Sequence, residues 1–136
     1  MLRIKRVYEP VSRADGRRVL VERLWPRGMT KDDAHLDAWN REVAPTGALR
    51  TWYGHDVEKW PEFKERYQTE LAKRPETWKP LVEAARSKSV TLLFSARDAE
   101  HSSAQVLRGF LLRHGAARRS VRTVSRRPAR RPAPGR

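Results

Sequence analysis

Cysteine is absent from the 136 residues of this chain. Its absence excludes disulfides, thiolate metal sites and cysteine nucleophiles. The sequence also lacks any run of about 18 apolar residues, so it predicts no transmembrane helix. Residues 1–5 (MLRIK) become charged at once and do not form the apolar stretch of a signal peptide. We therefore expect a cytoplasmic protein that does not act at a membrane.

The common nucleotide-binding motifs are missing as well. The chain contains neither a Gly-x-Gly-x-x-Gly turn nor a Walker phosphate loop, so nothing predicts chemistry that depends on ATP or a dinucleotide. Ser95 lacks the flanking glycines of the Gly-x-Ser-x-Gly elbow, which argues against a serine nucleophile at this position. The sequence therefore predicts no cofactor.

Basic residues are in excess and unevenly distributed. The 30 Lys and Arg outnumber the 16 Asp and Glu, for a formal net charge of +14. Residues 116–136 contain eight Arg, three Pro and no acid, a composition that cannot bury enough apolar surface to offset its ordering entropy. We predict a single domain over residues 1–115, which hold all eleven aromatic residues, and a disordered Arg/Pro-rich tail over 116–136.

Three segments have the patterns of β-strands. Residues 2–8 alternate apolar and basic side chains, which predicts a strand with one buried face, and residues 18–25 are rich in β-branched and large apolar side chains. Residues 90–94 (VTLLF) form a continuous apolar run, which favours a strand buried on both faces. The connection between the first two strands is short enough for a hairpin and also fits a short crossover, so the sequence leaves both open.

Apolar side chains at helical spacing predict helices between these strands and after the last one. The expected helical markers are Leu36, Trp39 and Val43 after a cap at Thr30; Leu49, Trp52 and Tyr53; Trp60, Phe63, Tyr67 and Leu71; Trp78, Leu81, Val82 and Ala85; and Ala104, Leu107, Phe110 and Leu111 within 102–113. A doubly buried strand followed directly by a helix is typical of an α/β architecture. We predict a small, mostly parallel sheet of three or four strands with flanking helices, followed by the disordered basic tail.

Charged residues cluster after two of the predicted strands, in residues 23–28 and 95–103. In open α/β sheets ligands bind beyond the carboxyl ends of the strands, where a helix N-terminus also favours an anion. Guanidinium groups suit phosphate and carboxylate, and these loops supply Arg23, Arg27 and Arg97. We predict that the loops lie side by side and hold a small anionic or phosphorylated ligand.

Histidines beside these arginines add the capacity for acid–base chemistry. His101 is the candidate proton carrier, because an imidazole titrates near neutrality; alternatively it only starts a helix. Asp98 either orients His101 or caps the last helix, a role for which Ser102 competes. His55, in a Gly-His-Asp loop, is expected to reach the same cleft. Whether the protein is an enzyme stays open.

A metal site is not predicted. His55, Asp56, Asp98, Glu100 and His101 would be the available ligands, but none of them has the spacing of a His-Glu-x-x-His motif. The neighbouring arginines would also oppose a cation.

The tail supports a hypothesis from another class. Clustered cations displace counterions from phosphates, so the basic body and the Arg-rich tail together would make the chain a nucleic-acid-associated accessory protein, with weak binding through residues 116–136. A merely solvated extension is the plain alternative for the tail. We prefer the small anionic ligand, because Arg23, Arg27 and Arg97 lie at strand ends and not along one helix face. The oligomeric state is not indicated.

Three segments taken together resemble a known family. They are residues 18–28 (RVLVERLWPRG), 52–56 (WYGHD) and 96–101 (ARDAEH). Over about residues 3–114 the chain is similar to the YeaO-like bacterial family, domain of unknown function 488, and the tail lies outside the resemblance. The resemblance implies a compact cytosolic α/β domain and implies no particular reaction.

The chain departs from the usual pattern of that family at two positions. Glu22 stands where the family usually has Asp, and Ser102 stands where it usually has Asn. A branch of the family has a cysteine near the position of Ser95, and its thiol chemistry cannot be carried over to a chain without cysteine.

Overall fold

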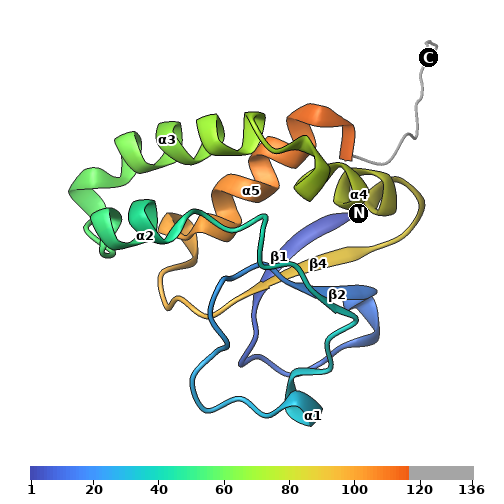
Figure 1. Ribbon diagram of the computed structural model, residues 1–136. Coiled ribbons are helices and arrows are strands. Elements are labelled where there is room, and N and C mark those ends of the chain that lie inside the picture. Colours follow the sequence, from blue (N-terminus) through green and yellow to red (C-terminus); the bar gives the residue numbers. More distant parts are fainter. Residues whose placement is uncertain (117–136) are drawn as a thin grey trace, which may run out of the picture.

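Four strands form one sheet in the structure, a computed structural model that describes residues 1–116 (Figure 1). The strands are β1 (Leu2–Arg6), β2 (Arg17–Leu20), β3 (Ala38–Trp39) and β4 (Val90–Phe94). Their order across the sheet is β1-β4-β2-β3, and all three pairings are parallel. The predicted α/β class, with a small parallel sheet and flanking helices, is confirmed.

The connection from β1 to β2 is a crossover. β1 pairs with one edge of β4, from Leu2 opposite Val90 to Arg6 opposite Phe94, and β2 pairs with the other edge. The first two strands are therefore separated by β4 and do not form a hairpin. The short 3-10 helix η1 (Arg13–Asp15) lies within this crossover.

The central strand β4 is buried on both faces, as predicted. Successive side chains of a strand point to opposite faces. Val90, Leu92 and Phe94 accordingly belong to a large core cluster shared with the helices, whereas Leu93 belongs to a second, smaller cluster. Burial on both faces explains the lack of polar alternation in this segment.

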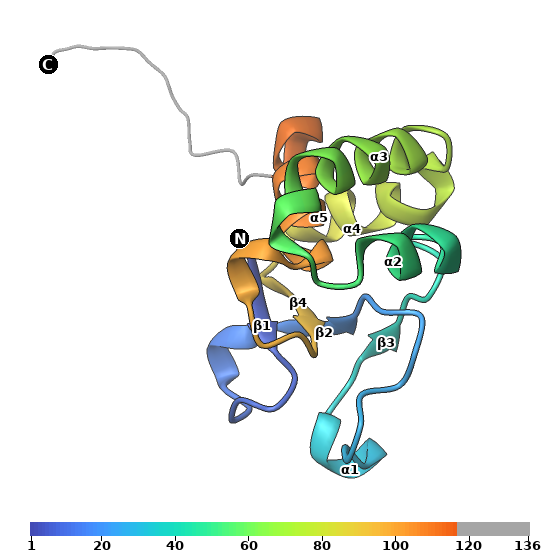
Figure 2. The ribbon, with the colours of Figure 1, turned by 90° about the vertical axis from the view of Figure 1, so that its left-hand side faces the viewer.

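Four helices cover one face of the sheet (Figures 1 and 2). They are α2 (Gly47–Tyr53), α3 (Trp60–Ala72), α4 (Pro75–Ser87) and α5 (Ser103–Leu111). Short turns join or extend them: the 3-10 helices η2 (Val57–Lys59) and η3 (Ala99–His101), and the π-helical turn η4 (Leu112–Ala116). Helices were expected at each of the four positions.

The predicted apolar stripe of α3 packs into the core. Phe63, Tyr67 and Leu71 are each no more than 1% exposed, and Trp60 is half-buried. The ring of Phe63 stacks on Tyr53 of α2, with 4.2 Å between the ring centroids. The helix therefore buries the side that its spacing indicated, and this side packs mainly against α2, α4 and α5, not against the strands.

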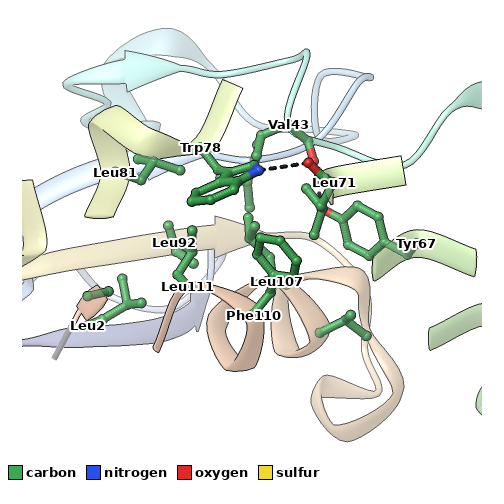
Figure 3. Packing of buried hydrophobic residues seen from close by; sticks show 14 of the residues in the cluster. Leu2, Val43, Tyr67, Leu71, Trp78, Leu81, Leu92, Leu107, Phe110 and Leu111 are labelled. Carbon is green, nitrogen blue, oxygen red and sulfur yellow. Dashed lines mark hydrogen bonds between the residues drawn. The ribbon is translucent and has the colours of Figure 1, made fainter. Parts of the chain in front are cut away.

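Polar atoms inside this core are hydrogen-bonded to backbone carbonyls (Figure 3). The indole nitrogen of Trp78 donates to the carbonyl oxygen of Leu71 at 2.8 Å, and the hydroxyl of Tyr67 donates to that of Val43 at 2.7 Å. Burial raises the pKa of Tyr67, so its hydroxyl stays a donor at every physiological pH. Such bonds let large aromatic side chains be buried without leaving a polar atom unsatisfied.

The opposite face of the sheet is covered by the segment between β2 and β3, which contains the short helix α1 (Lys31–Ala34) (Figures 1 and 2). Thr30 caps this helix as predicted, accepting a hydrogen bond from the backbone N–H of Asp33. Trp25 and Trp39 pack edge to face here, with ring centroids 5.3 Å apart. The buried residues of this second cluster are Val7, Leu20, Ala34 and Leu93.

The predicted helix that carries Leu36, Trp39 and Val43 is wrong. Helix α1 ends at Ala34, because His35 takes a left-handed conformation with φ of 48°. Trp39 instead belongs to β3, which pairs with the open edge of β2. The backbone groups of that edge give a two-residue strand its hydrogen bonds, and this tertiary pairing outweighs the helical spacing.

The second predicted strand, residues 18–25, is shorter than expected. Regular pairing ends at Leu20, and the N–H of Val21 donates a last hydrogen bond to the carbonyl oxygen of Leu93 at 3.1 Å. The chain then leaves the sheet, so Arg23 lies beyond the strand and not within it. Residues 22–28 are therefore free to form a wall at the carboxyl edge of the sheet.

A buried carboxylate, that of Asp15, links three strands on the face of the sheet that carries the smaller cluster. Asp15 accepts hydrogen bonds from Lys5 Nζ at 3.0 Å, from the N–H of Ser12 at 3.0 Å and from the guanidinium of Arg18. The hydroxyl of Thr91 donates to the backbone carbonyl oxygen of Asp15 at 2.7 Å. Residues of β1, β2 and β4 thus meet at one polar cluster.

The guanidinium of Arg18 extends this cluster to α1. It donates to the carbonyl oxygens of Ala34 at 2.9 Å and His35 at 3.0 Å, both at the C-terminal end of that helix. Burial raises the pKa of Asp15, but the hydrogen bonds from Lys5, Ser12 and Arg18 outweigh this effect, and the pKa lies below its ordinary value. Asp15 is therefore ionised and fully paired.

The predicted disordered tail, residues 116–136, lies outside the described residues except for Ala116. Ala116 itself is fully buried. Among residues 1–116, no helix combines the length and the apolar character that crossing a membrane requires.

We expect the Phe63→Ala variant to lose about 3–5 kcal/mol of unfolding free energy, because the deletion leaves a cavity under α2 and α3. Chemical denaturation measures the loss. Lys64→Ala, at an exposed position of the same helix, is the control and should be nearly neutral. A neutral Phe63→Ala would contradict the observed packing.

We expect Asp15→Asn to destabilise the fold by about 3–5 kcal/mol at neutral pH, because it leaves Arg18 buried without its partner. The lowered pKa of Asp15 means that the ion cluster stabilises the fold above about pH 4, the ordinary range of aspartate. This stabilisation is lost as the pH falls through the lowered pKa.

The difference between wild type and Asp15→Asn should therefore shrink in acid, as measured by urea denaturation over a series of pH values. Asp32→Asn, at an exposed position of α1, serves as the control. A difference that stays constant down to strongly acidic pH would refute the ionised state of Asp15.

Candidate functional site: a cleft at the carboxyl edge of the sheet

A cleft of about 740 Å³ opens where the parallel strands end. The cleft is lined by residues 22–27 after β2, by residues 44–45 after β3, and by residues 95–98 and 101–103 after β4. Part of α2, the loop that follows this helix, and Phe63 of α3 complete the lining. The six residues predicted for the site all border this one cleft: Arg23, Arg27, His55, Arg97, Asp98 and His101. The two charged loops thus meet as the sequence predicted, because β2 and β4 are adjacent and parallel.

Two side chains from the end of β1 hold these loops in place. Arg6 donates through Nε to the carbonyl oxygen of Ala96 at 3.0 Å and through Nη2 to that of Ser95 at 3.1 Å. The hydroxyl of Tyr8 donates to the carbonyl oxygen of Arg27 at 2.8 Å. The sequence analysis did not predict this role. Both residues lie at or just after the carboxyl end of the first strand, and in a parallel sheet this end lies at the same edge as the ends of β2 and β4.

His101 and Asp98 form a pair at the rim of the cleft. Asp98 Oδ2 lies 2.7 Å from His101 Nδ1, and Asp98 Oδ1 accepts from the N–H of His101 at 3.3 Å. The hydrogen bond from His101 is the largest influence that lowers the pKa of Asp98 below its ordinary value. The ionised carboxylate therefore accepts the proton at Nδ1, which leaves Nε2 as the atom that can exchange a proton with a ligand.

Of the two alternatives for Asp98, the contact with His101 is the one the structure has, because Asp98 does not cap the last helix. Asp98 caps the 3-10 helix η3, whereas Ser102 caps α5 by accepting from the N–H of Gln105 at 3.3 Å. The predicted competition for the last helix is thus resolved in favour of Ser102.

Aromatic side chains support His101 from the helical side. The hydroxyl of Tyr53 donates to the carbonyl oxygen of His101 at 2.8 Å, and the ring of Trp60 meets the imidazole edge to face at 5.1 Å. Burial raises the pKa of Tyr53, and the nearby charges of Asp98 and Asp56 raise it further. The Tyr53 hydroxyl is therefore a fixed donor and not a titrating group in the site.

His55 reaches the cleft from the loop after α2. Its backbone is left-handed, with φ of 60°, and its ring lies 6.2 Å from that of Tyr53. The side chain is exposed, and among the described residues no hydrogen-bond partner holds it. It is less constrained than His101.

Arg23 serves the fold. Its Nε donates to the carbonyl oxygen of Pro45 at 2.8 Å and its Nη2 to that of Ala44 at 3.4 Å, while Glu42 lies 3.9 Å from Nη1. These contacts supply the partner that a charge at this position needs. Arg23 borders the cleft but fixes the segment after β3.

Three other arginines line the cleft and have no bonded partner for their guanidinium groups among the described residues. Arg27, Arg97 and Arg50 of α2 line it and are exposed. Within residues 1–116, none of these guanidinium groups has a carboxylate or carbonyl partner. Arg50 was not predicted; its position just before residues 52–56 was the one signal, and only the packing of α2 places it here.

An acidic side chain lies in the same cleft. Glu22 Oε1 accepts a hydrogen bond from the hydroxyl of Ser95 at 2.6 Å, which links the loops after β2 and β4. In the part of the chain that the structure describes, no cluster of three or more His, Asp or Glu could hold a metal ion.

Comparison with known proteins agrees with this architecture. A family model described as the inactive DUF488-N3 subclade matches residues 1–129. The chain belongs to the DUF488 family. Over 110 residues it is 40% identical to the uncharacterized protein YeaO of Escherichia coli, a match that covers 81% of this chain and 96% of that protein.

Other relatives are matched over a shorter segment. The uncharacterized proteins Mb3100c of Mycobacterium bovis and Rv3073c of Mycobacterium tuberculosis are each 50% identical over 70 residues, which is 52% of this chain and 59% of theirs. No solved structure matches the chain.

We expect removal of the imidazole in His101→Ala to raise the pKa of Asp98 toward its ordinary value, because the hydrogen bond that lowers it is lost. Carbon-13 NMR titration of the carboxyl groups measures the shift. The pKa of Asp15, whose partners lie on the other face of the sheet, should not change. An unchanged pKa of Asp98 would contradict the hydrogen bond between Asp98 and His101.

Proposed function

We propose that this protein binds a small anionic or phosphorylated ligand in the cleft at the carboxyl edge of its sheet. The observation that carries the proposal is that Arg27, Arg50 and Arg97 line one cleft and that none of their guanidinium groups has a protein partner among the described residues. Like charges held together repel one another, and an anion would relieve that repulsion. Guanidinium groups also offer the paired donors that phosphate oxygens accept.

The pair of His101 and Asp98 would place a proton carrier beside such a ligand. With Nδ1 committed to Asp98, Nε2 is available to donate to a phosphate oxygen or to accept a proton from it. The matched subclade is described as inactive, which favours ligand binding without catalytic turnover. We therefore propose a binding protein, with His101 as part of the ligand shell.

The charge of the tail favours a second candidate. Residues 116–136 carry eight Arg and no acid, which suits weak, salt-dependent association with nucleic acid. Nucleic-acid binding by the tail would not depend on the cleft. The affinity of the protein for a DNA duplex would then fall steeply with salt concentration, and the Arg97→Ala substitution would leave this affinity unchanged.

We expect the affinity for inorganic phosphate and pyrophosphate to fall about 10- to 100-fold in Arg27→Ala, Arg50→Ala and Arg97→Ala, the effect of losing a charge-assisted hydrogen bond. Isothermal titration calorimetry on the full chain measures it. Arg17→Ala, an exposed arginine at the opposite edge of the sheet, is the matched control. Wild-type affinity in all three cleft variants would contradict the proposal.

A further inference from the structure

Glu22 is a carboxylate without a cation in a cleft that arginines line. Within residues 1–116 no lysine, arginine or histidine forms an ion pair with it; the adjacent Arg23 is bound instead to Glu42 and to the carbonyl oxygens of Ala44 and Pro45. Among the described residues, the one group that donates to the carboxylate of Glu22 is the hydroxyl of Ser95. A single hydrogen bond leaves the carboxylate most of its capacity to accept others.

A carboxylate accepts hydrogen bonds through two oxygens, and here Ser95 occupies only Oε1. Glu22 lines the cleft, and its Oε2 has no hydrogen-bond partner among the described residues. It repels an anion, so the anionic part of a ligand must lie toward Arg27, Arg50 and Arg97. What Glu22 attracts is a hydrogen-bond donor, from the same ligand or from water.

Two common hydrogen-bond donors of small ligands are the ammonium group and the hydroxyl group, and the charge of the cleft favours the hydroxyl. An ammonium group would have to enter a cleft bordered by four arginines, counting Arg23, against two carboxylates, Glu22 and Asp98. A hydroxyl carries no charge and avoids this repulsion. It can donate to Oε2 of Glu22 and accept from a neighbouring guanidinium at once.

On this basis we infer that the ligand is a hydroxylated phosphate. Its phosphate is held by Arg27, Arg50 and Arg97, and a hydroxyl of its carbon skeleton donates to Glu22. The inference rests on the proposed function, because it uses the same anion site. It adds that Glu22 determines which phosphorylated compounds the site prefers. Glu22 is half-buried, and a ligand without hydroxyls would cover its carboxylate without pairing it. An acceptor that a ligand covers and leaves unpaired costs binding energy, which is how such a site discriminates.

Glycerol 3-phosphate and propyl phosphate are the probes, because they differ only in two hydroxyl groups. Calorimetry on the full chain should give about tenfold tighter binding of glycerol 3-phosphate, the effect of one hydrogen bond to a charged group. In Glu22→Gln and Glu22→Ala this ratio should fall to about threefold or less, while inorganic phosphate binds at least as tightly as before. Glu42→Gln, which removes an exposed carboxylate outside the cleft, should keep the tenfold ratio.

Equal affinity of the wild type for the two probes would overturn the inference, and so would a tenfold ratio that survives in both Glu22 variants. In either case binding of inorganic phosphate would leave the proposed function standing. If the wild type bound neither probe nor inorganic phosphate, the proposed function would fail and this inference with it.

Discussion

The parallel pairing of β4 between β1 and β2 is the constraint on which the rest of the structure depends. Because Val90–Phe94 is buried on both faces, the helices must cover one side of it and the segment between β2 and β3 the other. Because its neighbours run in the same direction, their carboxyl ends meet at one edge. The cleft lies at this edge because of the strand order, and the loops that form it begin side by side whatever their sequences are.

Arginine does two different jobs around this cleft. Arg6 and Arg23 donate to backbone carbonyls and so fix the loops after β4 and β3, where irregular backbone would otherwise leave acceptors unpaired. Arg27, Arg50 and Arg97 have no such partners among the described residues and face the cleft. The first group holds the walls of the cleft in place, so the residues of the second group line the cleft before a ligand arrives, and a preformed site lowers the cost of binding.

The sequence could predict what local pattern and strand direction determine, and little else. The apolar run 90–94 predicted the central strand, and the stripe of Phe63, Tyr67 and Leu71 predicted the main helix. The expected ends of two parallel strands predicted that the two charged loops meet. Trp39 was placed in a helix because a two-residue strand has no periodicity and exists only through its partner β2. Arg50 was missed for the same reason, since only tertiary packing brings α2 to the cleft.

The central claim is that Arg27, Arg50 and Arg97 together form an anion site. Its most direct test is a crystal of the full chain grown with tungstate, a heavy analogue of phosphate that anomalous X-ray scattering locates without ambiguity. The account predicts a tungstate ion in the cleft at hydrogen-bonding distance from these guanidinium groups. Tungstate bound elsewhere on the protein while the cleft stays free of it would contradict the claim.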